Sequence, residues 1–147
     1  MAKKLLQYRG TGREAWWRMI HNKIYLLEDD PDIRTIVNFI LLKEGYNVEA
    51  FEKIGDLNDR LLRGGTPALF LMDVSLPDGN GLELCKKLVS DRKYASIPVL
   101  IMSAGVCTEE KARAVGATYF INKPFEMKYF LKKVNDLVPL SEHHEPG

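Results

Sequence analysis

Residues 23–30 read KIYLLEDD, a hydrophobic run that ends in three consecutive carboxylates. Residues 68–73 read ALFLMD and repeat this arrangement, with Asp73 closing the run. Each run has the length and apolarity of a strand that is buried on both faces of a parallel sheet. Ligands bind at the carboxyl edge of such a sheet. Carboxylates gathered there repel one another unless a hard divalent cation lies among them, so both stretches predict a magnesium site beside one aspartate.

The bulk composition limits the class of protein. The chain has 147 residues, enough for one domain, and 46% of them are hydrophobic, which suffices for a core. Its net charge of +1 gives no indication of nucleic-acid binding. No apolar run approaches the ~20 residues of a membrane span, and no secretory signal precedes residue 23. Cys85 and Cys107 lack the spacing of a metal-binding or redox pair, which favours reduced thiols in a cytoplasmic protein.

Strand-like and helix-like segments alternate beyond residue 22. The expected strands are residues 23–27, 46–51, 68–72, 99–102 and 118–121. Apolar residues at helical spacing follow each of them. Five strand–helix repeats predict an α/β fold with a parallel sheet and helices on both faces.

The chain divides into three parts in this interpretation. Residues 23–138 form the single domain, and residues 139–147 form a short polar tail. Residues 1–22 carry five basic residues against Glu14 and fall outside the predicted sheet. They are interpreted as a non-native or disordered extension, and the alternative is an amphipathic segment for a membrane surface or a partner.

Polar side chains follow four of the expected strands. They are Glu28 with Asp29, then Asp73, Ser103 and Lys123. Because the strands are parallel, we expect all five side chains to meet at one edge of the sheet. Carboxylates bind Mg²⁺, an aspartate can attack a phosphoryl group, and a lysine and a hydroxyl can hold phosphoryl oxygens. Asp73 alone could be a strand-end residue that caps the next turn, but the presence of Glu28, Asp29 and Lys123 favours a site.

Four segments carry a family resemblance. They read LLEDD at 26–30, LMDVSLPDGNG at 71–81, IMSA at 101–104, and a stretch at 116–125 that begins Gly-Ala and ends Lys-Pro-Phe. In this order and spacing they resemble a bacterial response-regulator receiver domain. The resemblance implies a flavodoxin-like, doubly wound five-stranded parallel sheet of strand order 2-1-3-4-5. It also implies a phosphorylation-dependent signalling switch, whose only reactions are its own phosphorylation and dephosphorylation, so it is not counted as an enzyme.

The resemblance assigns the metal and the phosphoacceptor residue by residue. Asp73 would accept the phosphoryl group and would also contact Mg²⁺. Asp29 would bind Mg²⁺ directly, and Glu28 directly or through water. The backbone carbonyl of Ser75 would complete the metal's coordination.

The resemblance also assigns the phosphoryl contacts and the switch. Ser103 and Lys123 would bind the phosphoryl group, and Ser103 and Phe120 would form the switch. Phe120 could equally be an ordinary core residue, and it lacks the hydroxyl of a tyrosine. The segment 104–116 is about two residues shorter than in many receivers, which predicts a short or irregular helix there.

Partners follow from the same resemblance. A histidine kinase or histidine phosphotransfer protein would supply the phosphoryl group, and a downstream protein target would respond. Neither direct nucleic-acid binding nor a membrane span is expected. A stand-alone receiver is favoured over one cut from a longer chain, because no further domain opens in the tail.

Three other functions could use the same fold or the same residues. A phosphohydrolase of the haloacid-dehalogenase type would need a second aspartate where this chain has Ser75. A flavodoxin-like electron carrier would need a phosphate loop rich in Ser, Thr and Gly where residues 28–31 read EDDP. A phosphate-independent protein-binding module on the same fold stays open as the alternative function.

Overall fold

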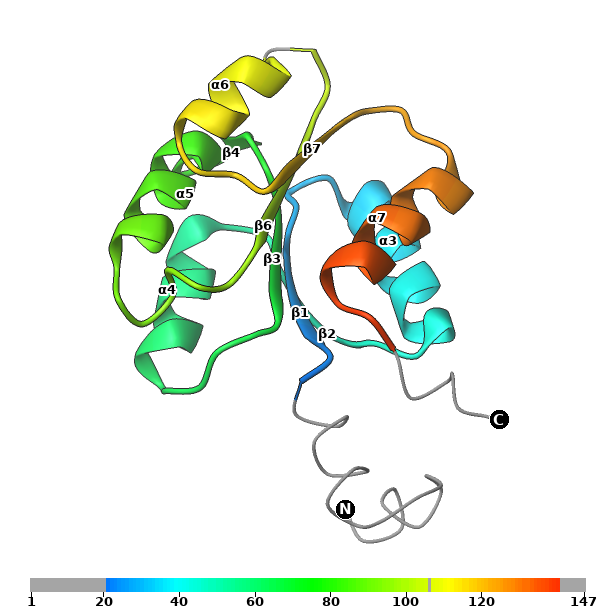
Figure 1. The fold of residues 1–147 in the computed structure, drawn as a ribbon, viewed down its shortest axis with the longest axis horizontal. Helices are drawn as coiled ribbons and strands as arrows, with labels where there is room; N and C mark the ends of the chain where they lie inside the picture. Colours follow the sequence, from blue (N-terminus) through cyan, green and yellow to red (C-terminus); the bar gives the residue numbers. More distant parts are fainter. Residues whose placement is uncertain (1–20, 106, 141–147) are drawn as a thin grey trace, which may run out of the picture.

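The computed structural model describes residues 21–105 and 107–140 (Figure 1). Five parallel strands form one sheet, in the order β2-β1-β3-β6-β7, which is the predicted order 2-1-3-4-5. Their bounds are β1 Lys23–Leu27, β2 Asn47–Phe51, β3 Leu69–Asp73, β6 Val99–Ser103 and β7 Tyr119–Asn122. The predicted extension lies outside the described residues as far as residue 20, and so does the tail from residue 141.

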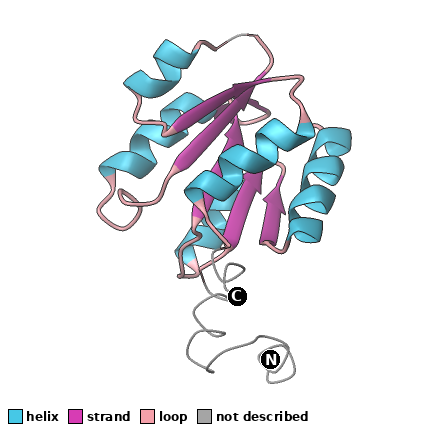
Figure 2. Cartoon of the chain, turned by 45° about the vertical axis from the view of Figure 1, so that its right-hand side comes forward, coloured by secondary structure: helices cyan, strands magenta, loops and turns pink. Residues whose placement is uncertain are grey.

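Helices cover both faces of this sheet, as the alternating pattern predicts (Figures 1 and 2). One face carries α3 (Pro31–Glu44) and α7 (Met127–Leu137). The other face carries α4 (Ile54–Leu62), α5 (Gly81–Ser90) and α6 (Glu109–Ala114), and α6 is short as predicted. None of the helices in the described ranges combines the length and the apolarity that crossing a membrane would require.

Local signals in the sequence set the ends of α3. The Asp30 side chain accepts hydrogen bonds from the backbone N–H groups of Asp32 and Ile33, at 2.9 and 3.1 Å. Pro31 occupies the first helical position, where its missing N–H costs no hydrogen bond. Gly45 ends the helix with a φ of 116°, a left-handed conformation that favours glycine. The acidic loop before α3 is therefore held close to the end of β1.

The sheet is buried on both faces. Alternate residues of β3 enter different core layers, with Phe70 and Met72 facing α4 and α5, and Leu71 facing α3 and α7. Phe130 of α7 is fully buried in the second layer. This two-sided burial explains why the strand sequences read as continuous apolar runs. It also leaves the carboxyl ends of the strands as the place where polar side chains gather.

Both cysteines are buried in the core layer on the side of the sheet that α4, α5 and α6 cover. Burial raises the pKa of the Cys85 thiol to about 11, and it also raises the pKa of Cys107. Because the thiolate is the reactive form, we expect neither cysteine to react appreciably with an aromatic disulfide reagent at pH 8 in the native protein. Addition of urea should release both thiols. Rapid reaction of either thiol before unfolding would contradict this burial.

Candidate metal and phosphoryl site

The sheet brings the predicted polar residues to one edge. Glu28 and Asp29 directly follow β1, whereas Asp73 and Ser103 are the last residues of β3 and β6. Asp73 pairs with Met102, so β3 and β6 end within one residue of each other. Lys123 follows β7, and its backbone N–H donates to the Ser103 carbonyl at 2.8 Å. The strand register alone thus places these side chains together.

Three carboxylates lie close enough to share a cation. Glu28, Asp29 and Asp73 each offer an oxygen, and these oxygens lie within 4.8 Å of one another. Hard oxygen donors in this number suit Mg²⁺, which keeps several waters and takes only a few protein ligands. Ser75, predicted to add its backbone carbonyl, lies two residues beyond Asp73 in the short strand β4 (Ser75–Leu76). The donor set therefore fits the predicted metal.

Lys123 compensates the charge of two of these carboxylates. Its Nζ lies 2.6 Å from Glu28 Oε1 and 3.1 Å from Asp73 Oδ2. Burial alone would lower the pKa of Lys123, but the hydrogen bonds to both carboxylates raise it above its ordinary value. Burial raises the pKa of Glu28, and its bonds with Lys123 and the Asp30 N–H offset this only in part. Glu28 is fully buried, so its negative charge depends on this ammonium group.

Hydrogen-bond donors surround the Asp73 carboxylate. The backbone N–H of Val74 donates to Asp73 Oδ1 at 2.6 Å, while Lys123 approaches Oδ2. The hydroxyl oxygen of Ser103 is buried and has no hydrogen-bond partner among the described residues. A buried hydroxyl without a partner is costly unless a ligand satisfies it. Ser103 is thus suited to meet an anionic group attached to Asp73.

Sequence reasoning missed Arg34 in the first turns of α3. Its Nη1 donates to the backbone carbonyls of Glu28 and Asp29, at 2.8 and 3.2 Å. The backbone N–H of Asp30 donates to Glu28 Oε2 at 3.2 Å. Together these bonds fix the loop that presents the acidic side chains. A basic residue one turn after the acidic loop was the available signal.

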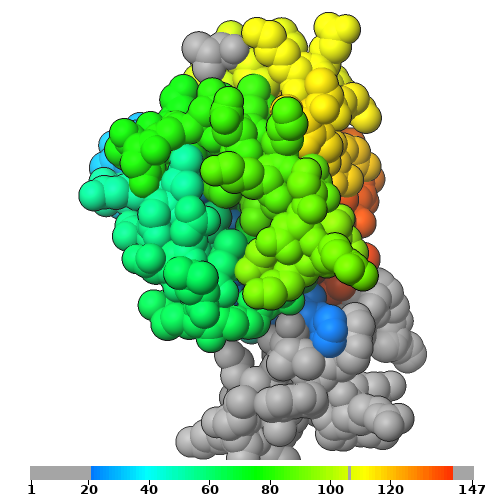
Figure 3. Space-filling model, turned by 90° about the vertical axis from the view of Figure 1, so that its left-hand side faces the viewer, coloured from blue at the N-terminus to red at the C-terminus, as the bar shows by residue number. Residues whose placement is uncertain are grey.

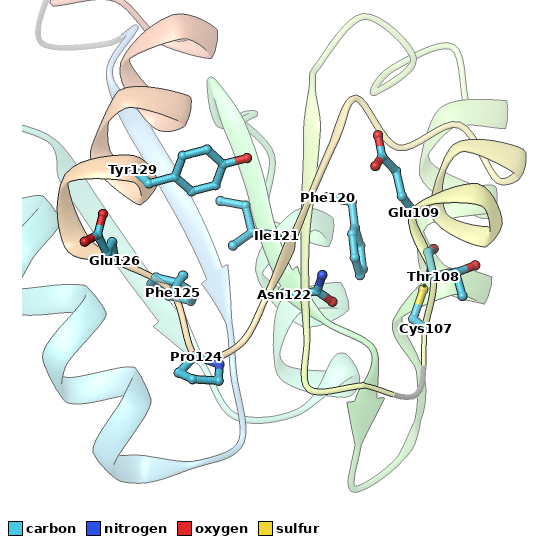
Figure 4. Close-up of a pocket in the computed structure, with 10 residues that line it drawn as sticks. All are labelled: Cys107, Thr108, Glu109, Phe120, Ile121, Asn122, Pro124, Phe125, Glu126 and Tyr129. Carbon is cyan, nitrogen blue, oxygen red and sulfur yellow. Dashed lines mark hydrogen bonds between the residues drawn. The ribbon is translucent and has the colours of Figure 1, made fainter.

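Phe120 lies outside the carboxylate cluster. It is partly buried and lines a groove of about 660 Å³ between α6 and α7. Figure 4 shows Phe120 on the side of Cys107 and Thr108, with Phe125 and Tyr129 across the groove. Neither Glu28 nor Asp73 lines this groove. The structure thus places the predicted switch aromatic beside an open groove rather than within the carboxylate cluster.

Comparisons with known proteins point to one family. Residues 24–135 match the model of the response regulator receiver domain. The transcriptional regulatory protein CreB of Escherichia coli is 32% identical over 82% of this chain and 52% of its own length. Histidine kinase P4 of Formosa agariphila is 31% identical over 78% of this chain and 8% of its own length. The non-phosphorylated receiver domain of HemR from Leptospira biflexa is 31% identical, with a TM-score of 0.69 over 85% of this chain and 98% of its own.

This chain spans about half the length of the transcriptional regulators it matches, and the match to the kinase is confined to a small part of that protein. The shared region coincides with the sheet and its carboxylate edge. The chain belongs to the response regulator receiver domain family of two-component signalling.

Proposed function

We propose that this receiver domain is a switch that accepts a phosphoryl group on Asp73 from the phosphohistidine of a histidine kinase or phosphotransfer protein, with Mg²⁺ bound. One observation carries the proposal: Asp73 is a strand-end carboxylate that shares Lys123 with Glu28 and lies within metal-sharing distance of Glu28 and Asp29. A structural strand-end aspartate needs none of these neighbours.

In this phosphoryl transfer the protein mainly positions the reacting groups and stabilises their charge. One oxygen of the Asp73 carboxylate forms a bond to phosphorus while the phosphorus–nitrogen bond of the donor breaks. The departing imidazole nitrogen keeps the bonding electron pair and takes up a proton from solvent. Lys123 and the backbone N–H of Val74 each donate a hydrogen bond to an oxygen of the Asp73 carboxylate. The Ser103 hydroxyl, which has no partner among the described residues, would donate to the phosphoryl group. Bound Mg²⁺ would offset the negative charge that the carboxylates and the phosphoryl group bring together.

The response to phosphorylation would pass from β6 to β7. Ser103 ends β6, and its neighbour across the sheet, Asn122, lies two residues after Phe120. A phosphoryl group that draws the Ser103 hydroxyl would change the packing behind it, where Phe120 borders the groove between α6 and α7 (Figure 4). A local charge would thereby bias two arrangements of a partner-binding surface.

The test is intact-mass analysis after incubation with acetyl phosphate, with and without Mg²⁺. Wild-type protein should gain a single phosphoryl adduct in the presence of Mg²⁺, and Asp73→Ala should gain none. Asp91→Asn removes an exposed carboxylate that accepts the N–H of Lys93 at the far end of α5, and it should behave as wild type. Absence of the adduct from folded wild-type protein, together with insensitivity to beryllofluoride, would favour a phosphate-independent binding module instead.

A further inference from the structure

A short hairpin connects the phosphoacceptor strand to α5. Ser75 pairs with Asn80, and Leu76 with Gly79, in the antiparallel strands β4 and β5 (Gly79–Asn80). Asp78 lies in the turn of this hairpin. Its side chain reaches the neighbouring helix, because both of its carboxylate oxygens accept hydrogen bonds from α4.

Through these bonds Asp78 caps the start of α4, although it lies more than 20 residues away in the sequence. The backbone N–H of Ile54 donates to Asp78 Oδ1, and that of Gly55 donates to Oδ2, both at 2.9 Å. Lys53, which stands at the N-cap position, gives α4 no side-chain cap. Orphan N–H groups at a helix start are normally satisfied by a local Ser, Thr, Asp or Asn. Here Asp78 takes that role. Figure 3 shows the green segment that contains the hairpin next to the blue-green segment that contains α4.

The hairpin has little freedom once Asp78 is attached. A Cβ at Gly79 would lie 2.8 Å from Ile54 Cδ1, so the turn packs directly against α4. At the other end, the N–H of Gly81 donates to the Val74 carbonyl at 2.7 Å. Ser75 lies between these two attachments. Its backbone position is thus set by β3 and Gly81 on one side and by Asp78 on the other.

We propose that Asp78 is a positioning residue for the metal site, an inference that depends on the proposed Mg²⁺-assisted function. By holding the β4–β5 hairpin on α4, Asp78 fixes the backbone at Ser75, whose carbonyl completes the coordination offered by Glu28, Asp29 and Asp73. A carbonyl ligand on a mobile hairpin would have to be ordered when the metal binds, and that ordering weakens affinity.

Coupling of this kind is reciprocal. If an attached hairpin strengthens Mg²⁺ binding, then Mg²⁺ must strengthen the attachment of the hairpin to α4. Saturating Mg²⁺ should therefore slow hydrogen exchange of the Ile54 and Gly55 amides in wild-type protein. In Asp78→Ala, Mg²⁺ should leave the exchange of these amides unchanged.

The decisive variants separate the hairpin link from helix capping. Asp78→Ala should raise the Mg²⁺ dissociation constant about tenfold, the lower end of the effect of removing a residue that orients metal ligands. Adding Lys53→Ser supplies a local cap, because Lys53 already has the extended backbone of an N-cap residue. The double variant should regain amide protection in α4 and keep the weakened Mg²⁺ affinity.

The measurement is a titration of the full chain with MgCl₂, followed by the amide NMR signals of Val74 and Gly81. Asp91→Asn is the matched control and should bind Mg²⁺ as wild type does. Unchanged affinity in Asp78→Ala, or affinity restored by Lys53→Ser, would overturn the positioning role while leaving the proposed function intact. If wild-type protein itself shows no Mg²⁺-dependent shifts, the proposed function fails first.

Discussion

Replacement of Gly81 by alanine will destabilise the domain by about 3 kcal/mol, at the upper end of the usual cost of overpacking a core. A Cβ at this position would lie 2.0 Å from the backbone carbonyl oxygen of Asp73 and 3.1 Å from the Cα of Val74. Both obstacles are main-chain atoms of Asp73 and Val74, so no side-chain rotation can relieve the contact. The backbone after β3 must move instead, and it carries Asp73 with it.

Urea unfolding measures the loss of stability, and phosphorylation by acetyl phosphate measures the effect of displacing Asp73. For the urea measurement Gly55→Ala is the matched control, since Gly55 is also helical and a Cβ there meets its nearest atom, Asp78 Oδ2, only at 3.4 Å. Alanine is the better helix former, so this control should be neutral or slightly stabilising. The Gly81 variant should lose stability and phosphoryl adduct together. A Gly81→Ala protein as stable as wild type would show that the contact is relieved at little cost.

The fold could be predicted because its signals are local and repeated. The runs at 23–27 and 68–72 are apolar on both faces, which requires a covered parallel sheet, and the structure confirms the sheet and its order. The carboxyl-terminal ends of β3, β6 and β7 lie one residue beyond the prediction, and β2, β3 and β7 begin one residue later than predicted. Those ends depend on pairing across the sheet, such as Ser103 with Asn122, and a single strand's sequence does not contain that pairing.

The edge of the sheet was predictable for the same reason, but the connections among its residues were not. Parallel strands must bring Asp73 and Lys123 to one side, whatever their partners are. Which carboxylate Lys123 approaches most closely depends on side-chain geometry, and the structure places it nearer Glu28 than Asp73. The bonds of Arg34 to the acidic loop and of Asp78 to α4 are likewise absent from any motif, since each depends on how neighbouring elements pack.

Lys123→Met will cost about 3–5 kcal/mol of unfolding free energy at pH 7, the range found when one partner of a buried ion pair is removed. Methionine keeps an unbranched side chain that is one atom shorter, but it leaves Glu28, which is fully buried, and Asp73 without their shared cation. Lys23→Met is the matched control, because Lys23 pairs with Glu49 at 2.7 Å where both side chains are about one-third exposed. That surface pair should contribute less than about 1 kcal/mol.

Two further measurements assign the cause of this loss. If uncompensated charge is responsible, Glu28→Gln in the Lys123→Met background should recover more than half of the lost stability, and so should a saturating concentration of Mg²⁺. If lost packing were responsible, neither change would help. Recovery by Mg²⁺ would mean that either of two cations can compensate the charge of the carboxylate cluster. The ammonium group of Lys123 would do so in the free protein, and the metal would do so during phosphorylation. Under the proposed function, the phosphoryl group would then reach a site whose negative charge is already offset, and this favours attack by Asp73 on an anionic donor.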